Sequence, residues 1–109
     1  MSIHSILVAT EFSDTPAGRY LSDGPHSGQA FRDTLLYPIL QKFDSVEVDL
    51  DGTLGCGSSF LEEAFGGLLR EKGMTLKEVK DKLTIKSRRK FYQDRIWKYI
   101  ADEASKHEA

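Results

Sequence analysis

The chain has 109 residues, of which 39% are hydrophobic and 29% are charged, and its net charge at pH 7 is -2. This length suits one domain with one core, residues 1–109, and the composition excludes a disordered or membrane-spanning chain and argues against a surface that binds nucleic acid throughout. Cys56 is the only cysteine, which excludes an internal disulfide and is compatible with the cytoplasm, and the first residues lack the pattern of a secretory signal.

The first half of the chain predicts a strand, a long loop and a helix. Residues 3–9 are rich in apolar, β-favouring side chains, which is typical of a buried strand. Residues 11–28 are polar and contain prolines and glycines, so they predict a long loop with a short strand around 19–21. An apolar stripe then predicts a helix over 29–43, with a kink at Pro38 because proline lacks the amide that a helix needs.

The second half predicts two more strands, each followed by a helix. Alternating apolar residues over 46–50 indicate a strand, and a period near 3.6 over 60–69 indicates an amphipathic helix. A capping-box pattern that begins at Thr75 predicts a short helix, followed by a strand over 83–86 and a final helix over 88–104. Strands that alternate with helices predict an α/β fold with parallel pairing, and no second domain is indicated.

Residues 49–54, DLDGTL, resemble the first motif of the haloacid-dehalogenase-type phosphatases. By that resemblance Asp49 would be the nucleophile and Asp51 the general acid and base. The acidic pair that should hold magnesium is missing, because the later aspartates lie on predicted helices and would supply too few oxygen ligands. A minimal magnesium-dependent phosphatase is therefore the alternative, and polar strand-end and turn residues are the simpler interpretation.

A pair of serines marks the start of the helix that follows. Ser59 and Glu62 match a capping box, in which Ser59 accepts from the first amides of the helix and Glu62 reaches back. Ser58 would then lie just outside the helix, exposed beside Gly57, where a phosphate would meet the positive end of the helix dipole. Glu62 and Glu63 oppose this by like-charge repulsion, and plain capping by both serines is the competing interpretation.

Several segments together resemble the STAS-like domains of unknown function, relatives of bacterial anti-sigma-factor antagonists. The main match is residues 45–73, SVEVDLDGTLGCGSSFLEEAFGGLLREKG, joined by residues 18–33, 35–40 and 96–100. The resemblance implies a small α/β domain with a mixed sheet of about four strands and helices packed on it. In the antagonists, the first serine of the pair is phosphorylated by a histidine-kinase-like ATPase, and the match places that role on Ser58.

The resemblance therefore implies a non-catalytic regulatory module without a cofactor, and it indicates that ATPase or a kinase as the protein partner. On a helical wheel Gly66 and Gly67 fall opposite the apolar stripe and predict a flat outer face for the partner, whereas internal close packing is the alternative. The residues expected to contact the partner are Gly57, Ser59, Glu62, Glu63, Gly66, Gly67 and Arg70.

The loop before the first helix holds a second candidate site. Arg19 lies near the start of that helix and Arg32 just inside it, so the two guanidiniums could bind a phosphate or carboxylate together, with Tyr20, Asp23 and His26 beside them. The alternative is that Arg19 pairs with Asp23 to fix the loop. The three histidines are scattered, so no metal site is expected.

Two further features allow opposite interpretations. The basic run at residues 86–90 is typical of a solvated helix start, although a nucleic-acid-associated accessory domain would also carry one. Cys56 lies between glycines near a helix start, which favours a lowered pKa, yet a small buried cysteine is the commoner case.

Overall fold

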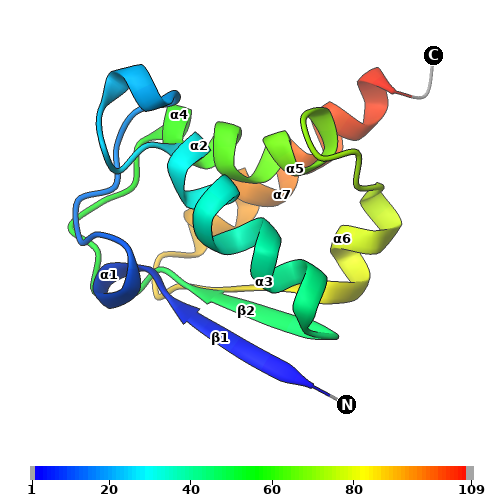
Figure 1. The fold of residues 1–109 in the computed structure, drawn as a ribbon, viewed down its shortest axis with the longest axis horizontal. Coiled ribbons are helices and arrows are strands. Elements are labelled where there is room, and N and C mark those ends of the chain that lie inside the picture. Colours follow the sequence, from blue (N-terminus) through cyan, green and yellow to red (C-terminus); the bar gives the residue numbers. More distant parts are fainter. Residues whose placement is uncertain (1, 108–109) are drawn as a thin grey trace.

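The computed structural model describes residues 2–107 and shows helices packed on a small sheet (Figure 1). The strands are β1 (Ile3–Leu7), β2 (Ser45–Asp49) and β3 (Leu83–Lys86), and they pair in the order β1-β2-β3. Both pairings are parallel, and Val48 lies between Ile6 and Ile85 at the centre of the sheet. The α/β class is therefore confirmed, but the mixed sheet of about four strands is wrong for the described residues, which form three parallel strands.

The strand expected around residues 19–21 is absent because a side chain takes its amides. The Asp23 carboxylate accepts hydrogen bonds from the backbone amides of Arg19 at 3.1 Å and Tyr20 at 2.8 Å. The chain curls there into a single turn of 3-10 helix, η1 (Leu21–Asp23). An amide that is bonded to a nearby carboxylate cannot join a sheet ladder, so this segment stays a loop.

The crossovers between the strands are helical. The first contains α1 (Val8–Glu11), η1 and a continuous helix made of α2 (Gly28–Phe31), the π-helical turn η2 (Arg32–Leu36) and α3 (Tyr37–Lys42). The second contains a helix made of α4 (Ser58–Leu61), the π-helical turn η3 (Glu62–Gly66) and α5 (Gly67–Arg70), followed by α6 (Leu76–Lys82). The last helix is α7 (Lys90–Lys106).

The helices α2 to α7 lie on one side of the sheet (Figure 1). Both crossovers step in the same direction across the sheet, and right-handed crossovers then bring their helices to the same face. Burial follows this arrangement in β3, where Leu83 and Ile85 are buried and Thr84 and Lys86 are exposed. None of the described helices covers the opposite face.

The helix from α4 to α5 is the centre of the core. Every residue from 60 to 69 is buried except Glu62, which is half-buried. The helix of residues 28–42 packs against it closely, because Gly28 has no side chain: a Cβ there would lie 2.5 Å from the carbonyl oxygen of Phe60. The central helix is thus enclosed by its neighbours rather than amphipathic.

The capping box predicted at Thr75 is confirmed. The Thr75 hydroxyl accepts from the Glu78 amide and the Glu78 carboxylate accepts from the Thr75 amide, each near 3 Å, so the capping box of α6 is complete. Near Pro38 the helix contains the π-helical turn η2, which ends two residues before the proline, and the kink at Pro38 stays a prediction.

Replacing Gly28 by alanine should destabilise the protein by about 1–3 kcal/mol, because the new methyl group would collide with backbone that cannot move away easily. Urea unfolding monitored by circular dichroism measures the effect. Gly57→Ala is the matched control: nothing lies within 4 Å of a Cβ at that position, so its cost should stay within about 1 kcal/mol. Equal losses in the two variants would contradict the close packing described here.

Candidate functional site

Ser58 is exposed at the first residue of the central helix. Gly57 precedes it in extended conformation, with φ -66° and ψ 152°, and its carbonyl accepts the Leu61 amide at 3.1 Å. Gly57, Ser58 and Ser59 are all exposed. The hydroxyl of Ser58 is therefore accessible from solvent at the amino end of a helix whose remaining residues are largely buried.

The predicted capping box between Ser59 and Glu62 is wrong. Gly57 is the residue that precedes the helix, and no side chain accepts a hydrogen bond from its first amides. The Glu62 carboxylate instead bonds the guanidiniums of Arg19 and Arg70. Hydrogen bonds between two charged groups are stronger than a bond from a carboxylate to a neutral amide. Glu62 therefore bonds two arginines from distant parts of the chain and does not cap the helix.

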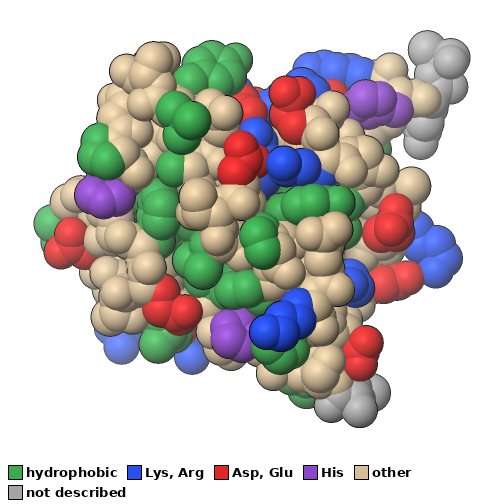
Figure 2. Space-filling view, in the orientation of Figure 1, with side chains coloured by type: hydrophobic (Ala, Val, Ile, Leu, Met, Phe, Trp, Pro, Cys, Tyr) green, Lys and Arg blue, Asp and Glu red, His purple; other side chains and the backbone are tan. Residues whose placement is uncertain are grey.

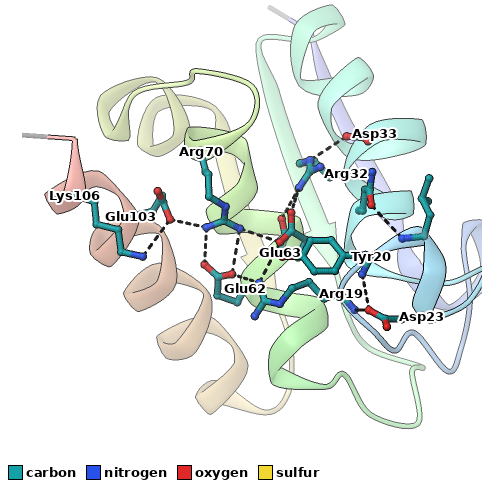
Figure 3. A network of polar contacts seen from close by, with 12 residues as sticks. Arg19, Tyr20, Asp23, Arg32, Asp33, Glu62, Glu63, Arg70, Glu103 and Lys106 are labelled. Atoms are coloured by element: carbon teal, nitrogen blue, oxygen red, sulfur yellow. Dashed lines mark hydrogen bonds and ion pairs between the residues drawn. The ribbon is translucent and has the colours of Figure 1, made fainter.

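A buried ion pair joins the two crossover helices (Figure 3). Arg32 Nη1 donates to Glu63 Oε2 at 2.6 Å and to the Glu63 carbonyl at 2.9 Å. Both side chains are only 4% exposed. Arg32 lies in the π-helical turn η2 and Glu63 in the π-helical turn η3, so the pair links the irregular turns of the two helices.

Further ion pairs extend this link into a network that reaches the loop and the last helix. Arg19 bonds the carboxylates of Glu62 and Glu63 from the loop side. Arg70 donates to Glu62 at 3.1 Å, to Glu63 at 3.0 Å and to Glu103 of α7 at 2.5 Å. We call these six residues, Arg19, Arg32, Glu62, Glu63, Arg70 and Glu103, the ion network.

The charges of the network support one another. Burial raises the pKa of Glu62, but hydrogen bonds from Arg70 and Arg19 outweigh it and hold that pKa below its ordinary range. Burial acts on Glu103 in the same sense, and Arg70 and His107 again bring its pKa below the ordinary range. Burial lowers the pKa of Arg70, while the bonds to Glu62 and Glu103 raise it by more.

The expectation of a flat outer face on this helix is wrong for Glu63, Gly66 and Gly67, which are buried. A Cβ on Gly67 would overlap the Arg32 side chain, and one on Gly66 would meet the Glu62 carboxylate. The glycines therefore leave room for the ion network, which is the internal close packing that the sequence left as the alternative.

The anion site expected at Arg19 and Arg32 is also wrong, because both guanidiniums already bond Glu63. Asp23 fixes the loop through the backbone amide of Arg19 rather than through its side chain. Tyr20 and His26 are exposed, and the His26 ring lies edge-on to Phe12 with 5.5 Å between centroids.

The aspartates of the phosphatase-like motif fasten the loops at the end of the sheet. Asp49 Oδ1 accepts the Asp51 amide at 2.9 Å, and Asp51 Oδ1 accepts the Arg88 amide at 2.8 Å. The Lys86 ammonium lies 3.7 Å from Asp49 Oδ2. Within residues 2–107, no three His, Cys, Asp or Glu side chains gather in a way that could hold a metal ion.

Cys56 is buried, and its amide donates to the hydroxyl of Tyr92 at 3.0 Å. Burial raises the pKa of the thiol more than the Thr53 hydroxyl lowers it. The lowered pKa considered from the sequence is therefore wrong, and Cys56 fills space in the core.

Sequence reasoning did not find Glu103 as a member of the ion network. Its signal was weak: one acidic residue in a helix with many charges, whose partner Arg70 lies 33 residues earlier. Only the packing of α7 against the central helix brings the two together.

Together the fold and the site define a small α/β domain in which helices cover one face of a parallel sheet and an exposed serine begins the central helix. A sequence model of one family, described as a STAS-like domain of unknown function, matches residues 27–90, more than half of the chain. The chain belongs to this family, which confirms the resemblance seen in the sequence. No curated protein and no solved structure matches the chain. Nowhere in residues 2–107 does a helix have the length and apolar character to cross a membrane.

Glu63→Gln should lower the free energy of unfolding by roughly 3–5 kcal/mol, because it leaves the buried Arg32 charge without its full counter-charge. Glu62→Gln, whose side chain is 22% exposed, should lower it by only about 1 kcal/mol. A double variant, Arg32→Met with Glu63→Met, should recover part of the loss, since no buried charge then stays unpaired. Urea unfolding measures all three, and a Glu63→Gln cost no larger than that of Glu62→Gln would contradict the role of the pair.

The lowered pKa values of Glu62 and Glu103 also predict how stability depends on pH. In the unfolded chain both carboxyls regain the ordinary pKa of 4.5, so their contribution is fully present above that pH and is lost as pH falls through the lower folded-state values. The urea midpoint should therefore stay nearly constant from neutral pH to about pH 5 and fall below it. Glu62→Gln should flatten this fall, and a parallel profile in the variant would argue against the assignment.

Proposed function

We propose that this chain is a non-catalytic regulatory module that binds a protein partner and is switched by phosphorylation of Ser58. The supporting observation is an exposed hydroxyl at the start of a helix that the ion network holds in place. Because the helix is anchored beyond Ser58, a phosphate there would alter the charge of a fixed surface. It would not need to reshape the domain.

The electrostatics of the helix also favour a phosphate at Ser58. From the sequence alone, the carboxylates of Glu62 and Glu63 were expected to repel a phosphate on Ser58. Both carboxylates are paired with arginines, Glu62 with two and Glu63 with three, so their negative charge is largely compensated. The first amides of the helix have no side-chain acceptor and point toward the same end.

The surface beside Ser58 suits a protein partner. The loop that carries Tyr20 and Leu21 and the start of α4 lie at the same end of the molecule (Figure 1), and the Leu54 amide bonds the Asp14 carbonyl at 2.8 Å to join the two loops. Leu54 is 75% exposed, and hydrophobic side chains reach the surface over the first loop in Figure 2. Exposed apolar side chains rimmed by polar ones are typical of interaction sites.

The partner proposed is a histidine-kinase-like ATPase or kinase, by similarity to the anti-sigma-factor antagonists. It would contact Gly57 and Ser59, the exposed members of the predicted set, and also the exposed loop around Tyr20. Phosphorylation adds a charge of about -2, which would repel an acidic surface on the partner and release it.

The experiment incubates the purified chain with ATP and a purified histidine-kinase-like ATPase. The wild type should gain the mass of one phosphoryl group, and Ser58→Ala should gain none. Ser105→Ala is the matched control and should be modified like the wild type, since this exposed serine lies on α7, outside the proposed contact surface. Ser58→Glu should weaken binding to the ATPase by about tenfold or more, measured by isothermal titration calorimetry.

Two results would contradict the proposal: unchanged mass and no binding in the wild type, or equal modification of Ser58→Ala. A phosphatase assay with magnesium separates the alternative. Hydrolysis by the wild type that Asp49→Asn abolishes would instead support an enzyme that uses the aspartate motif.

A further inference from the structure

A cavity of about 360 Å³ lies at the carboxyl end of the sheet, apart from Ser58 and the ion network. The pairing of β2 and β3 ends where the Leu50 amide bonds the Lys86 carbonyl at 2.9 Å. Beyond that bond the cavity is lined by two loops, one that contains Asp51 and Thr53 and one that runs through Ser87 into α7. In open α/β sheets, crevices outside the carboxyl ends of the strands are where ligands bind.

Two arginines on the wall of this cavity form no ion pair with another side chain within residues 2–107. Of the six arginines in the chain, three belong to the ion network, and Arg95 lies over the ring of Phe91 at 5.0 Å. The other two, Arg88 and Arg89, line the cavity, and none of the ion pairs within residues 2–107 includes either guanidinium. Guanidiniums that are not paired within the protein are suited to bind an oxyanion.

Arg88 and Arg89 are exposed, and side chains hold their backbone amides in place. The Arg88 amide donates to Asp51 Oδ1 at 2.8 Å, and the Arg89 amide donates to Ser87 Oγ at 3.1 Å. Both arginines are therefore attached to a wall whose shape the sheet determines, and ordering them on a ligand costs less than ordering a free loop.

The remaining polar groups of the lining are three hydroxyls and one carboxylate. Tyr92 is 5% exposed and accepts the Cys56 amide, so its own hydroxyl proton can be donated into the cavity. The Ser87 hydroxyl can donate as well, because its oxygen accepts from Arg89. Asp51 is the one carboxylate on the wall, and it would accept a bond from a hydroxyl group of the ligand.

We propose that this cavity binds a small phosphate monoester that carries hydroxyl groups, with the phosphate on Arg88 and Arg89 and a hydroxyl on Asp51. The cavity volume exceeds the space of a phosphate ion alone and falls in the range of small-molecule sites. This site goes beyond the switch at Ser58 and does not depend on it.

The test titrates the full chain with ribose 5-phosphate, inorganic phosphate and ribose at constant ionic strength, and follows backbone amide shifts by NMR. Ribose 5-phosphate should give saturable shifts at residues 50–53 and 87–92, stronger binding than phosphate, and no effect from ribose alone. Arg88→Gln with Arg89→Gln should weaken binding by about tenfold or more. Lys77→Gln with Lys98→Gln removes the same charge from helix surfaces elsewhere and should leave binding unchanged.

A second variant tests the carboxylate. Asp51→Asn keeps an oxygen for the Arg88 amide but removes the negative charge, so inorganic phosphate should bind more tightly and the preference for the sugar phosphate should shrink. Equal weakening in the two double variants, shifts that do not saturate, or no shifts at residues 50–53 and 87–92 would overturn the proposal. So would binding of a single-stranded oligonucleotide at these residues without binding of ribose 5-phosphate.

Discussion

The arrangement of the helices depends on one buried ion pair, Arg32 with Glu63. Charges so far from water are tolerated only when nearly every hydrogen-bonding atom finds a partner, and here the guanidinium bonds both the carboxylate and the carbonyl of Glu63. That requirement constrains the surroundings. Each helix contains a π-helical turn where it contributes its charged side chain, and Gly67 leaves the space that the arginine fills. The pair thus restricts how the two crossover helices can lie against each other.

Because of this constraint, one part of the central helix is anchored and another part is exposed. Its middle and end are fixed through Glu63 to the first crossover and through Arg70 to α7, whereas its first residues meet solvent. A regulatory surface benefits from such a division, because a partner encounters the same geometry each time and little conformational entropy is lost on docking. The loop that carries Arg19 is anchored to the same helix, since the Arg19 guanidinium pairs with Glu62 and Glu63.

The sequence could predict the features that follow from neighbouring residues or from periodicity. Alternating strands and helices indicated the parallel α/β class, and the Thr75 capping box and the exposed Ser58 were correct because their surroundings are local. The predictions were wrong where contacts with residues distant in the sequence determine the position of a side chain. Glu62 has the spacing of a capping residue but lies between two arginines. Gly66 was placed outside by a helical wheel, which assumes that one side of a helix meets solvent, whereas residues 60–69 of this helix are all buried except the half-buried Glu62.

The uncovered face of the sheet has a consequence for how insertions and deletions act on this chain. Successive side chains of a strand lie on opposite faces of the sheet, and in β2 Val48 is buried whereas Glu47 is half-buried. Deleting one residue from the turn before β2 would shift the register of the strand by one residue. Every side chain of β2 would then change face, and the Glu47 carboxylate would lie among the buried side chains. Substitutions on the uncovered face of the sheet should therefore cost less stability than an insertion or deletion in that turn. The sequence of such a domain would then diverge by substitution at these positions and would keep the length of the turn.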